Sequence, residues 1–230
     1  MGTGITPRKA KFRAAVLFSA AALIAALAVA ARLLEKDSPL SQTVSAAAIS
    51  AAVYIASAIL FRSSGNKKTV RRAIIAIFLI YLILLINFTV FDGHFGRTAP
   101  EENSNMTFTD YFRQKGNLRP FRMISNQTKG LFNGNYALRH YAVNIFGNLL
   151  AFAPFALFLP LFFKKCNKYR VFFPVMTLII FAVETCQILL RVGSFDIDDY
   201  ILNMLGASVA FALLSTKKGK RLMRNIAEPK

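Results

Sequence analysis

Residues 184–206 read ETCQILLRVGSFDIDDYILNMLG, and this stretch places a glutamate, an arginine and three aspartates between two apolar runs. Such a concentration of ionisable groups is unusual in a chain that is 55% hydrophobic. The runs on either side have the length of membrane helices, which need about 20 residues to cross a hydrocarbon layer of about 30 Å. The stretch therefore predicts two membrane helices joined by a short polar loop.

Apolar runs of this length recur along the 230 residues. The six runs span residues 14–34, 40–61, 73–91, 144–163, 171–190 and 200–216. Unalternated Ala, Leu, Ile and Phe favour helices over the strands of a membrane barrel. The first run follows a basic start, as a signal peptide does, but it is long for one, so we interpret it as a retained anchor. The sequence therefore predicts an all-α protein, a polytopic bundle of six transmembrane helices.

The net charge of +18 is concentrated on alternate loops. Four basic residues precede the first predicted helix, five lie between the second and third, four between the fourth and fifth, and six after the last. The only acid in these segments is Glu228. Because basic loops stay in the cytoplasm, both termini are predicted to be cytoplasmic. Short basic loops without a nucleic-acid-binding motif favour membrane lipids over nucleic acid as the partner.

The predicted organisation has three parts. An N-terminal transmembrane hairpin covers residues 1–72, a four-helix membrane core covers 73–216, and a basic cytoplasmic tail covers 217–230. The core includes an extracytoplasmic loop at 92–143, whose many aromatic residues favour an ordered segment at the headgroup layer.

Three predicted helices carry polar residues at helical spacing, so that each set lies on one face. The sets are Glu184, Gln187 and Arg191; Asp196, Asp199 and Asn203, followed by Gly206; and Asn144, Gly147, Asn148 and Ala151. Small residues permit close approach of helices, and asparagines form hydrogen bonds between them. By the predicted topology, all three sets fall in the outer half of the membrane.

The acidic residues have more than one interpretation. Arg191 can pair with Asp196 or Asp199 and simply brace a tight turn. Glu184 is harder to explain structurally, because a carboxylate inside a membrane is costly unless it is protonated or paired, and is by default a functional candidate. Asp196, Asp198 and Asp199 also offer oxygen ligands to a divalent cation, although no spacing here is diagnostic of a metal site.

The order of three motifs resembles the VanZ-like family of membrane proteins, which is associated with teicoplanin resistance. The motifs are NLRPF at 117–121, NIFGNLLAFAPF at 144–155, and ETCQILLR at 184–191 with FDIDD at 195–199 and Asn203 and Gly206. The resemblance covers residues 117–206. It implies a multi-pass protein of the bacterial cytoplasmic membrane that is linked to reduced glycopeptide susceptibility.

We expect a polar pocket, open to the outer leaflet, that binds a lipid-linked or peptidoglycan-related ligand, with an arginine contacting its phosphate or carboxylate. The expected ligand-binding residues are Glu184, Gln187, Arg191, Asp196, Asp199, Asn203, Asn148, Asn144, Asn117 and Arg119. One alternative is a membrane enzyme that modifies an envelope lipid, with Glu184 as general base and Arg191 stabilising negative charge. Two further alternatives are a small transporter and a purely structural partner of other envelope proteins. The lack of a visible repeat or broken-helix pair disfavours the transporter.

Overall fold

The computed structural model describes residues 39–64, 67–91, 105–135 and 138–228. In these residues the regular structure is helical, apart from a two-residue parallel pairing of β1 (Gly116–Asn117) with β2 (Phe195–Asp196). Five helical segments are long and apolar enough to cross a membrane: Gln42–Ile59, Lys68–Val90, Tyr141–Phe162, Tyr169–Leu189 and Ile197–Ser215. The expected all-helical membrane class therefore fits the structure, while the span expected at 14–34 lies outside the described residues.

The chain divides into two compact units. The first comprises residues 1–85 and 224–230, and it contains α2 (Pro39–Ser64) and all but the last residue of α3 (Lys67–Ile86). Within it, the hydroxyl of Tyr54 lies 3.3 Å from the backbone oxygens of both Asn225 and Ile226. The second unit comprises residues 86–223 and contains all the polar residues of the three motifs.

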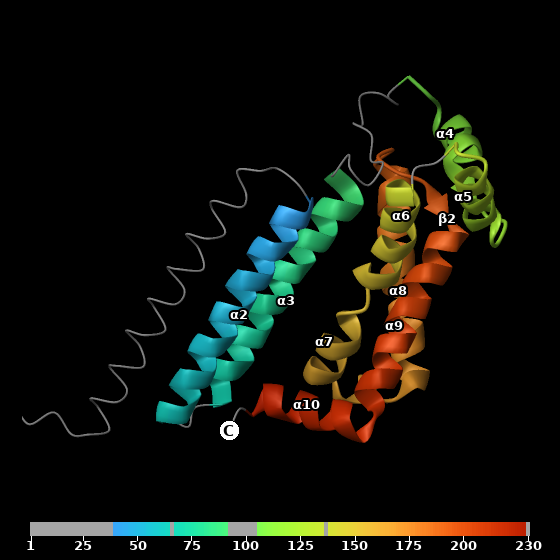
Figure 1. Cartoon of the computed structure of the whole chain (residues 1–230). Coiled ribbons are helices and arrows are strands. Elements are labelled where there is room, and N and C mark those ends of the chain that lie inside the picture. The colour runs from blue at the N-terminus through green and yellow to red at the C-terminus, as the bar shows by residue number, and fades with distance from the viewer. Residues whose placement is uncertain (1–38, 65–66, 92–104, 136–137, 229–230) are drawn as a thin grey trace, which may run out of the picture. The chain divides into compact units, whose positions relative to one another are not determined.

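The second unit is a helical bundle with short helices at one end. Its elements are η1 (Asn87–Phe91, a π-helix), α4 (Phe108–Lys115), β1, α5 (Arg122–Phe132), α6 (Leu138–Ala151), α7 (Phe155–Phe162), η4 (Lys164–Asn167), α8 (Tyr169–Leu189), β2 and α9 (Ile197–Ser215). The last helix, α10 (Lys217–Ala227), begins in this unit, and its residues from Arg224 onward belong to the first unit. Because α9 packs against α6, α7 and α8, it is the central helix. Helices α4 and α5 lie across one end of the bundle (Figure 1).

Apolar side chains fill the space between α9 and its neighbours. Phe152, Phe172, Met176 and Ile180 are at most 1% exposed. Large apolar residues also cover the outside of the bundle, where Leu178 is 71% exposed. A surface of this kind suits lipid rather than water, since acyl chains are as apolar as leucine.

The fourth predicted helix is interrupted, which corrects the continuous helix expected over 144–163. Helix α6 ends at Ala151 and α7 begins at Phe155, with a turn between them in which Phe155 N donates to Phe152 O at 3.1 Å. The cause is Pro154, which lacks a backbone N–H and whose ring clashes with the carbonyl four residues earlier. The two short helices still make one apolar span, Tyr141–Phe162.

Helices α6 and α9 approach closely at Gly206. A Cβ atom at this position would lie 1.7 Å from the backbone oxygen of Leu149. Only glycine fits here, and this agrees with the packing role that small residues have between membrane helices. The crossing holds the polar residues of α6 beside those of α9.

Candidate functional site

Helix α8 carries two of the predicted polar residues into the interior. Glu184 is 4% exposed and Gln187 is 1% exposed. The amide nitrogen of Gln187 donates to the backbone oxygen of Thr89 in η1 at 2.9 Å. Its Oε1 atom is buried and has no hydrogen-bond partner among the residues that the structure describes. Gln187 therefore ties α8 to η1 and leaves one buried acceptor unused.

The end of α8 places Arg191 in a left-handed backbone conformation, with φ of 57°. Val192 N donates to Gln187 O, and Arg191 N donates to Ile188 O, at 3.1 and 3.2 Å. This is the Schellman arrangement of a helix C-terminus, in which the left-handed position usually holds glycine. An arginine therefore stands, half-buried, where a glycine would be less strained.

The start of α9 is joined to α8 and to the segment before α5. The backbone nitrogen of Asp196 lies 3.5 Å from Oε2 of Glu184, a long hydrogen bond. The carboxylate of Asp196 caps α9, because Oδ1 accepts from Asp198 N at 2.8 Å. The same oxygen accepts from Nδ2 of Asn117 at 2.9 Å. Burial raises the pKa of Asp196 above its ordinary value, although both hydrogen bonds and the charge of Arg122 oppose the shift.

Asp198 caps a helix that is distant in sequence. Its side chain is fully buried and accepts hydrogen bonds from the backbone nitrogens of Phe121 and Ile124. Phe121 is the N-cap residue of α5 and has no side-chain acceptor, and Ile124 lies in the first turn of this helix. We expected Asp198 only as a candidate metal ligand. The sequence did contain a sign of this role, because a helix that starts after Pro120 has no capping residue of its own and needs an acceptor from elsewhere in the chain.

The polar face of α6 is also bound within the protein. Nδ2 of Asn148 donates to Oδ1 of Asp199 on α9. Nδ2 of Asn144 donates to Oε1 of Gln127 on α5 at 3.1 Å. Asn203 lies one turn beyond Asp199, is 2% exposed, and has an Oδ1 atom without a partner in the described part of the chain.

The structure thus brings most of the predicted residues together at one end of the second unit. Asn117, Glu184 and Asp196 share one network, and Asn148 and Asp199 form a second contact. Tyr111 was not predicted, yet it is fully buried and its hydroxyl donates to the backbone oxygen of Gly193 at 2.6 Å. Through this hydrogen bond Tyr111 connects α4 to the loop between α8 and α9. Arg119, a predicted ligand-binding residue, is exposed.

A metal centre finds no support at this end. Among the described residues, no group of three or more His, Cys, Asp and Glu side chains is placed to hold a metal ion. Both carboxylate oxygens of Asp198 already accept hydrogen bonds from backbone nitrogens. In the described residues Asp198 therefore serves as the cap of α5.

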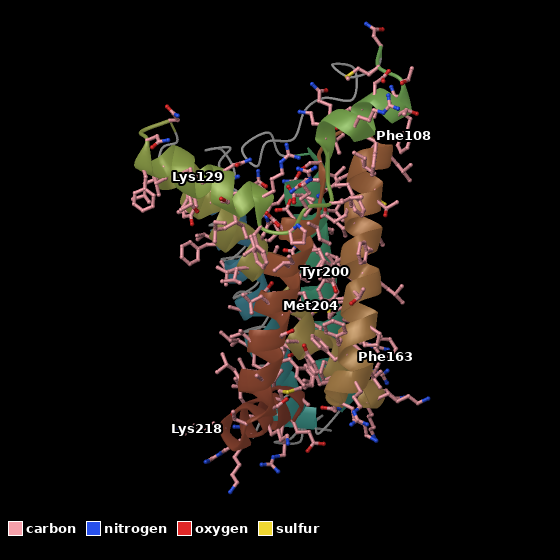
Figure 2. All side chains as sticks on the ribbon, turned by 90° about the vertical axis from the view of Figure 1, so that its right-hand side faces the viewer. Phe108, Lys129, Phe163, Tyr200, Met204 and Lys218 are labelled. Atoms are coloured by element: carbon pink, nitrogen blue, oxygen red, sulfur yellow. The ribbon has the colours of Figure 1, made fainter. Side chains whose placement is uncertain are left out.

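The described acids of the second unit are confined to one end, where basic residues such as Arg119 and Arg122 lie with them. These acids are Asp110 in α4, Glu184 near the end of α8, and Asp196, Asp198 and Asp199 at the start of α9, beside α5. Figure 2 shows this end with Phe108 and Lys129, and the opposite end with Phe163 and Lys218. The basic residues next to Phe163 and Lys218 have no acid near them in sequence. We call the two ends the acidic end and the basic end.

Comparison with known proteins places the chain in a family. Residues 78–218 match the family model described as VanZ/LLP1, which is more than half of the 230 residues. The match confirms the resemblance drawn from the three sequence motifs. No curated protein and no solved structure gives a match.

Proposed function

The chain belongs to the VanZ/LLP1 family, and from this premise we propose that it acts in the bacterial cell envelope and lowers susceptibility to teicoplanin-type glycopeptides. In this proposal the protein binds a lipid-linked or peptidoglycan-related ligand that carries a phosphate or carboxylate group. The binding surface is the acidic end of the second unit, and it faces the outer leaflet.

The observation that carries this proposal is a turn with exposed arginines that is hydrogen-bonded to α9 at both ends, residues 117–122, which we call the arginine turn. Its first residue, Asn117, is fixed by Asp196, and its end is fixed by the cap that Asp198 provides. Arg119 and Arg122 are both exposed. Asp196 and Asp198 therefore act as supports, and the charges exposed on the turn are those of the arginines.

The chemistry of the arginine turn suits an anionic lipid. A guanidinium group can donate two parallel hydrogen bonds to a phosphate or carboxylate. Leu118 and Phe121, beside the arginines, are 62% and 60% exposed. Apolar and cationic groups side by side match a ligand whose phosphate lies at the headgroup layer and whose chain enters the bilayer.

Helix α8 offers further polar groups at this end of the unit. Glu184 and Gln187 lie on one face of α8, and the Oε1 atom of Gln187 is a free acceptor within the described residues. An acceptor of this kind favours ligands with hydroxyl or amide donors, which sugars and peptides both have. In the proposal, Arg191 at the end of α8 completes the cationic surface.

The orientation is supported by charge. The basic end carries exposed lysines and arginines in η4, at the start of α8 and in α10. Loops rich in these residues stay in the cytoplasm, which leaves the acidic end outside.

Binding to the full-length protein in nanodiscs tests the proposal. The probe is a fluorescent lipid-linked disaccharide peptide with its diphosphate, compared with the same lipid alcohol without the diphosphate. The double variant Arg119→Gln, Arg122→Gln should weaken binding of the diphosphate probe about tenfold or more, since a hydrogen bond to a charged group contributes about 1.5–3 kcal/mol. The matched control is Arg113→Gln, which removes an exposed arginine from α4.

A cellular assay tests the link to glycopeptides. Arg191→Ala and Glu184→Gln, expressed at the normal level, should each change the binding of a labelled glycopeptide to cells and their susceptibility. If both variants behave as the wild type, the assignment of these residues is wrong. Equal affinity of the wild type for the probe and the bare lipid alcohol would likewise exclude recognition of the anionic group.

Transport is the second candidate, and one observation favours it. The apolar span Tyr141–Phe162 is interrupted at Pro154, as helices that line transport sites often are. Transport predicts movement of the probe between leaflets of a reconstituted vesicle, which binding alone does not. An enzyme that modifies an envelope lipid would instead change lipid or muropeptide masses between cells with and without the protein.

A further inference from the structure

Helix α10 has two faces of opposite character. The apolar side has Gly219, Leu222, Met223 and Ile226, which recur at i, i+3, i+4 and i+7. The basic side has Lys217, Lys220, Arg221 and Arg224 at the same spacing, with Lys218 beside them. All five basic side chains are exposed, and the helix contains no acid.

A sharp turn sets α10 apart from α9. Thr216 caps α10, because its Oγ1 accepts from Gly219 N at 3.1 Å. A Cβ atom on Gly219 would lie 2.5 Å from the backbone oxygen of Leu213, so only glycine permits this approach. As a result, α10 runs across the basic end of the bundle instead of continuing α9 (Figure 1).

The apolar side of α10 is not fully covered by the protein. Leu222 lies between Gly219 and Ile226 on this face and is 53% exposed. An amphipathic helix at the end of a membrane bundle is at the depth of the membrane–water interface. There it can lie parallel to the membrane surface, with its apolar side against the acyl chains and its basic side among the headgroups.

A second set of cations lies close to the start of α10. The hydroxyl of Tyr169, at the start of α8, lies 2.9 Å from that of Ser208, and its ring packs on Phe211. The start of α8 is therefore beside the last turns of α9. The exposed residues Lys164, Lys165, Lys168 and Arg170 are found there.

We propose that α10 is an interfacial helix whose basic side, together with the cations of η4 and the start of α8, binds the anionic headgroups of the inner leaflet. The partner is the surface of a bilayer that contains anionic phospholipid. Charge complementarity is the reason for choosing an anionic bilayer as the partner. These segments contain many cations and no acid, and each cation near an anionic surface adds to the attraction. This surface is separate from the arginine turn and does not depend on the function proposed there.

The chain has no tryptophan, which permits a clean test. The variant Leu222→Trp introduces one reporter on the apolar side of α10, and Lys220→Trp introduces one on the basic side, about half a turn around the helix. Each full-length variant is reconstituted in nanodiscs of phosphatidylcholine, with or without phosphatidylglycerol, and with brominated lipid as the quencher. We expect blue-shifted, lipid-quenched emission for Leu222→Trp, stronger with phosphatidylglycerol, and water-exposed emission for Lys220→Trp.

Replacing the five basic residues of α10 by glutamine should reduce the effect of phosphatidylglycerol, and replacing Lys164, Lys165, Lys168 and Arg170 as well should remove it. High salt should do the same, because the Debye length falls from about 10 Å at 0.1 M to about 3 Å at 1 M. Three results would each overturn the proposal. The first is equal quenching of the two reporters. The second is emission from Leu222→Trp that is blue-shifted but not quenched by lipid, because this result means that the side chain contacts protein. The third is quenching of Leu222→Trp that does not depend on phosphatidylglycerol.

Discussion

Oδ2 of Asp198 accepts a hydrogen bond from the backbone nitrogen of Ile124 at 3.1 Å, across 74 residues of sequence. The contact explains why a fully buried carboxylate is tolerated. The first backbone N–H groups of α5 need acceptors, and the positive end of the helix dipole favours a negative charge there. Asp198 therefore joins the arginine turn to the first turn of α9.

Replacing Asp198 by alanine should destabilise the protein by about 2–3 kcal/mol, because two backbone donors lose their acceptor. Asp198→Asn should cost less, since one oxygen remains. Thermal unfolding of the purified protein in detergent measures both effects. The control is Asp110→Asn, an exposed acid in α4 that accepts a hydrogen bond from the hydroxyl of Thr107 at 2.6 Å. If Asp198→Ala is as stable as this control, the cap contributes little.

The pH dependence of stability should contain a contribution from Asp196. Burial raises the pKa of this acid in the folded protein above its ordinary value of 3.8. Between the two pKa values the folded state binds more protons, so the contribution is complete below the unfolded pKa and is lost as the pH rises through the folded pKa.

Asp196→Asn isolates this contribution, because the oxygen that accepts from Asn117 and Asp198 N is kept while the titration is removed. The free energy of unfolding of the wild type, relative to the variant, should fall as the pH rises from about 4 to about 7. Unfolding of both proteins across this range is the measurement. A difference that stays constant or grows with pH would show that burial does not control this carboxyl group.

Much of the fold could be predicted from the sequence, because membrane helices follow from apolar length alone. Five of the six predicted spans correspond to apolar helices in the described residues, and the sixth, at 14–34, lies outside them. The interruption at Pro154 was missed. A proline inside an apolar run can kink a helix or end it, and the outcome depends on the packing around it.

The candidate site was less predictable, and the reason is physical. Helical spacing showed that Glu184 and Gln187 share a face, but it could not show what that face meets. The contacts of Asn117 with Asp196 and of Asp198 with α5 are formed between segments more than 70 residues apart. Such pairings depend on how the short helices fold over the bundle, and a single sequence contains no direct signal for them.

Gly206→Ala should be strongly destabilising, by about 3 kcal/mol, as expected when overpacking has no space to relax into. The new Cβ would meet the backbone of Leu149, at 1.7 Å from its oxygen and 2.6 Å from its carbon, and backbone cannot move aside as a side chain can. Thermal unfolding in detergent measures the loss. The control Ala212→Val adds more volume to α9 at an exposed position and should be nearly neutral. Similar stabilities of the two variants would contradict the close crossing of α6 and α9.

Arg191 allows the effect of its backbone to be separated from that of its side chain. Its φ of 57° is unfavourable for any residue with a Cβ, by about 1 kcal/mol or more relative to glycine. Arg191→Gly and Arg191→Ala both remove the guanidinium group, but only the glycine variant relieves the strain. We therefore expect Arg191→Gly to be more stable than Arg191→Ala by about 1 kcal/mol, measured by thermal unfolding. If the guanidinium group serves the proposed function, both variants should nevertheless lose the glycopeptide effect equally. A glycine variant that keeps the full effect would limit Arg191 to ending α8.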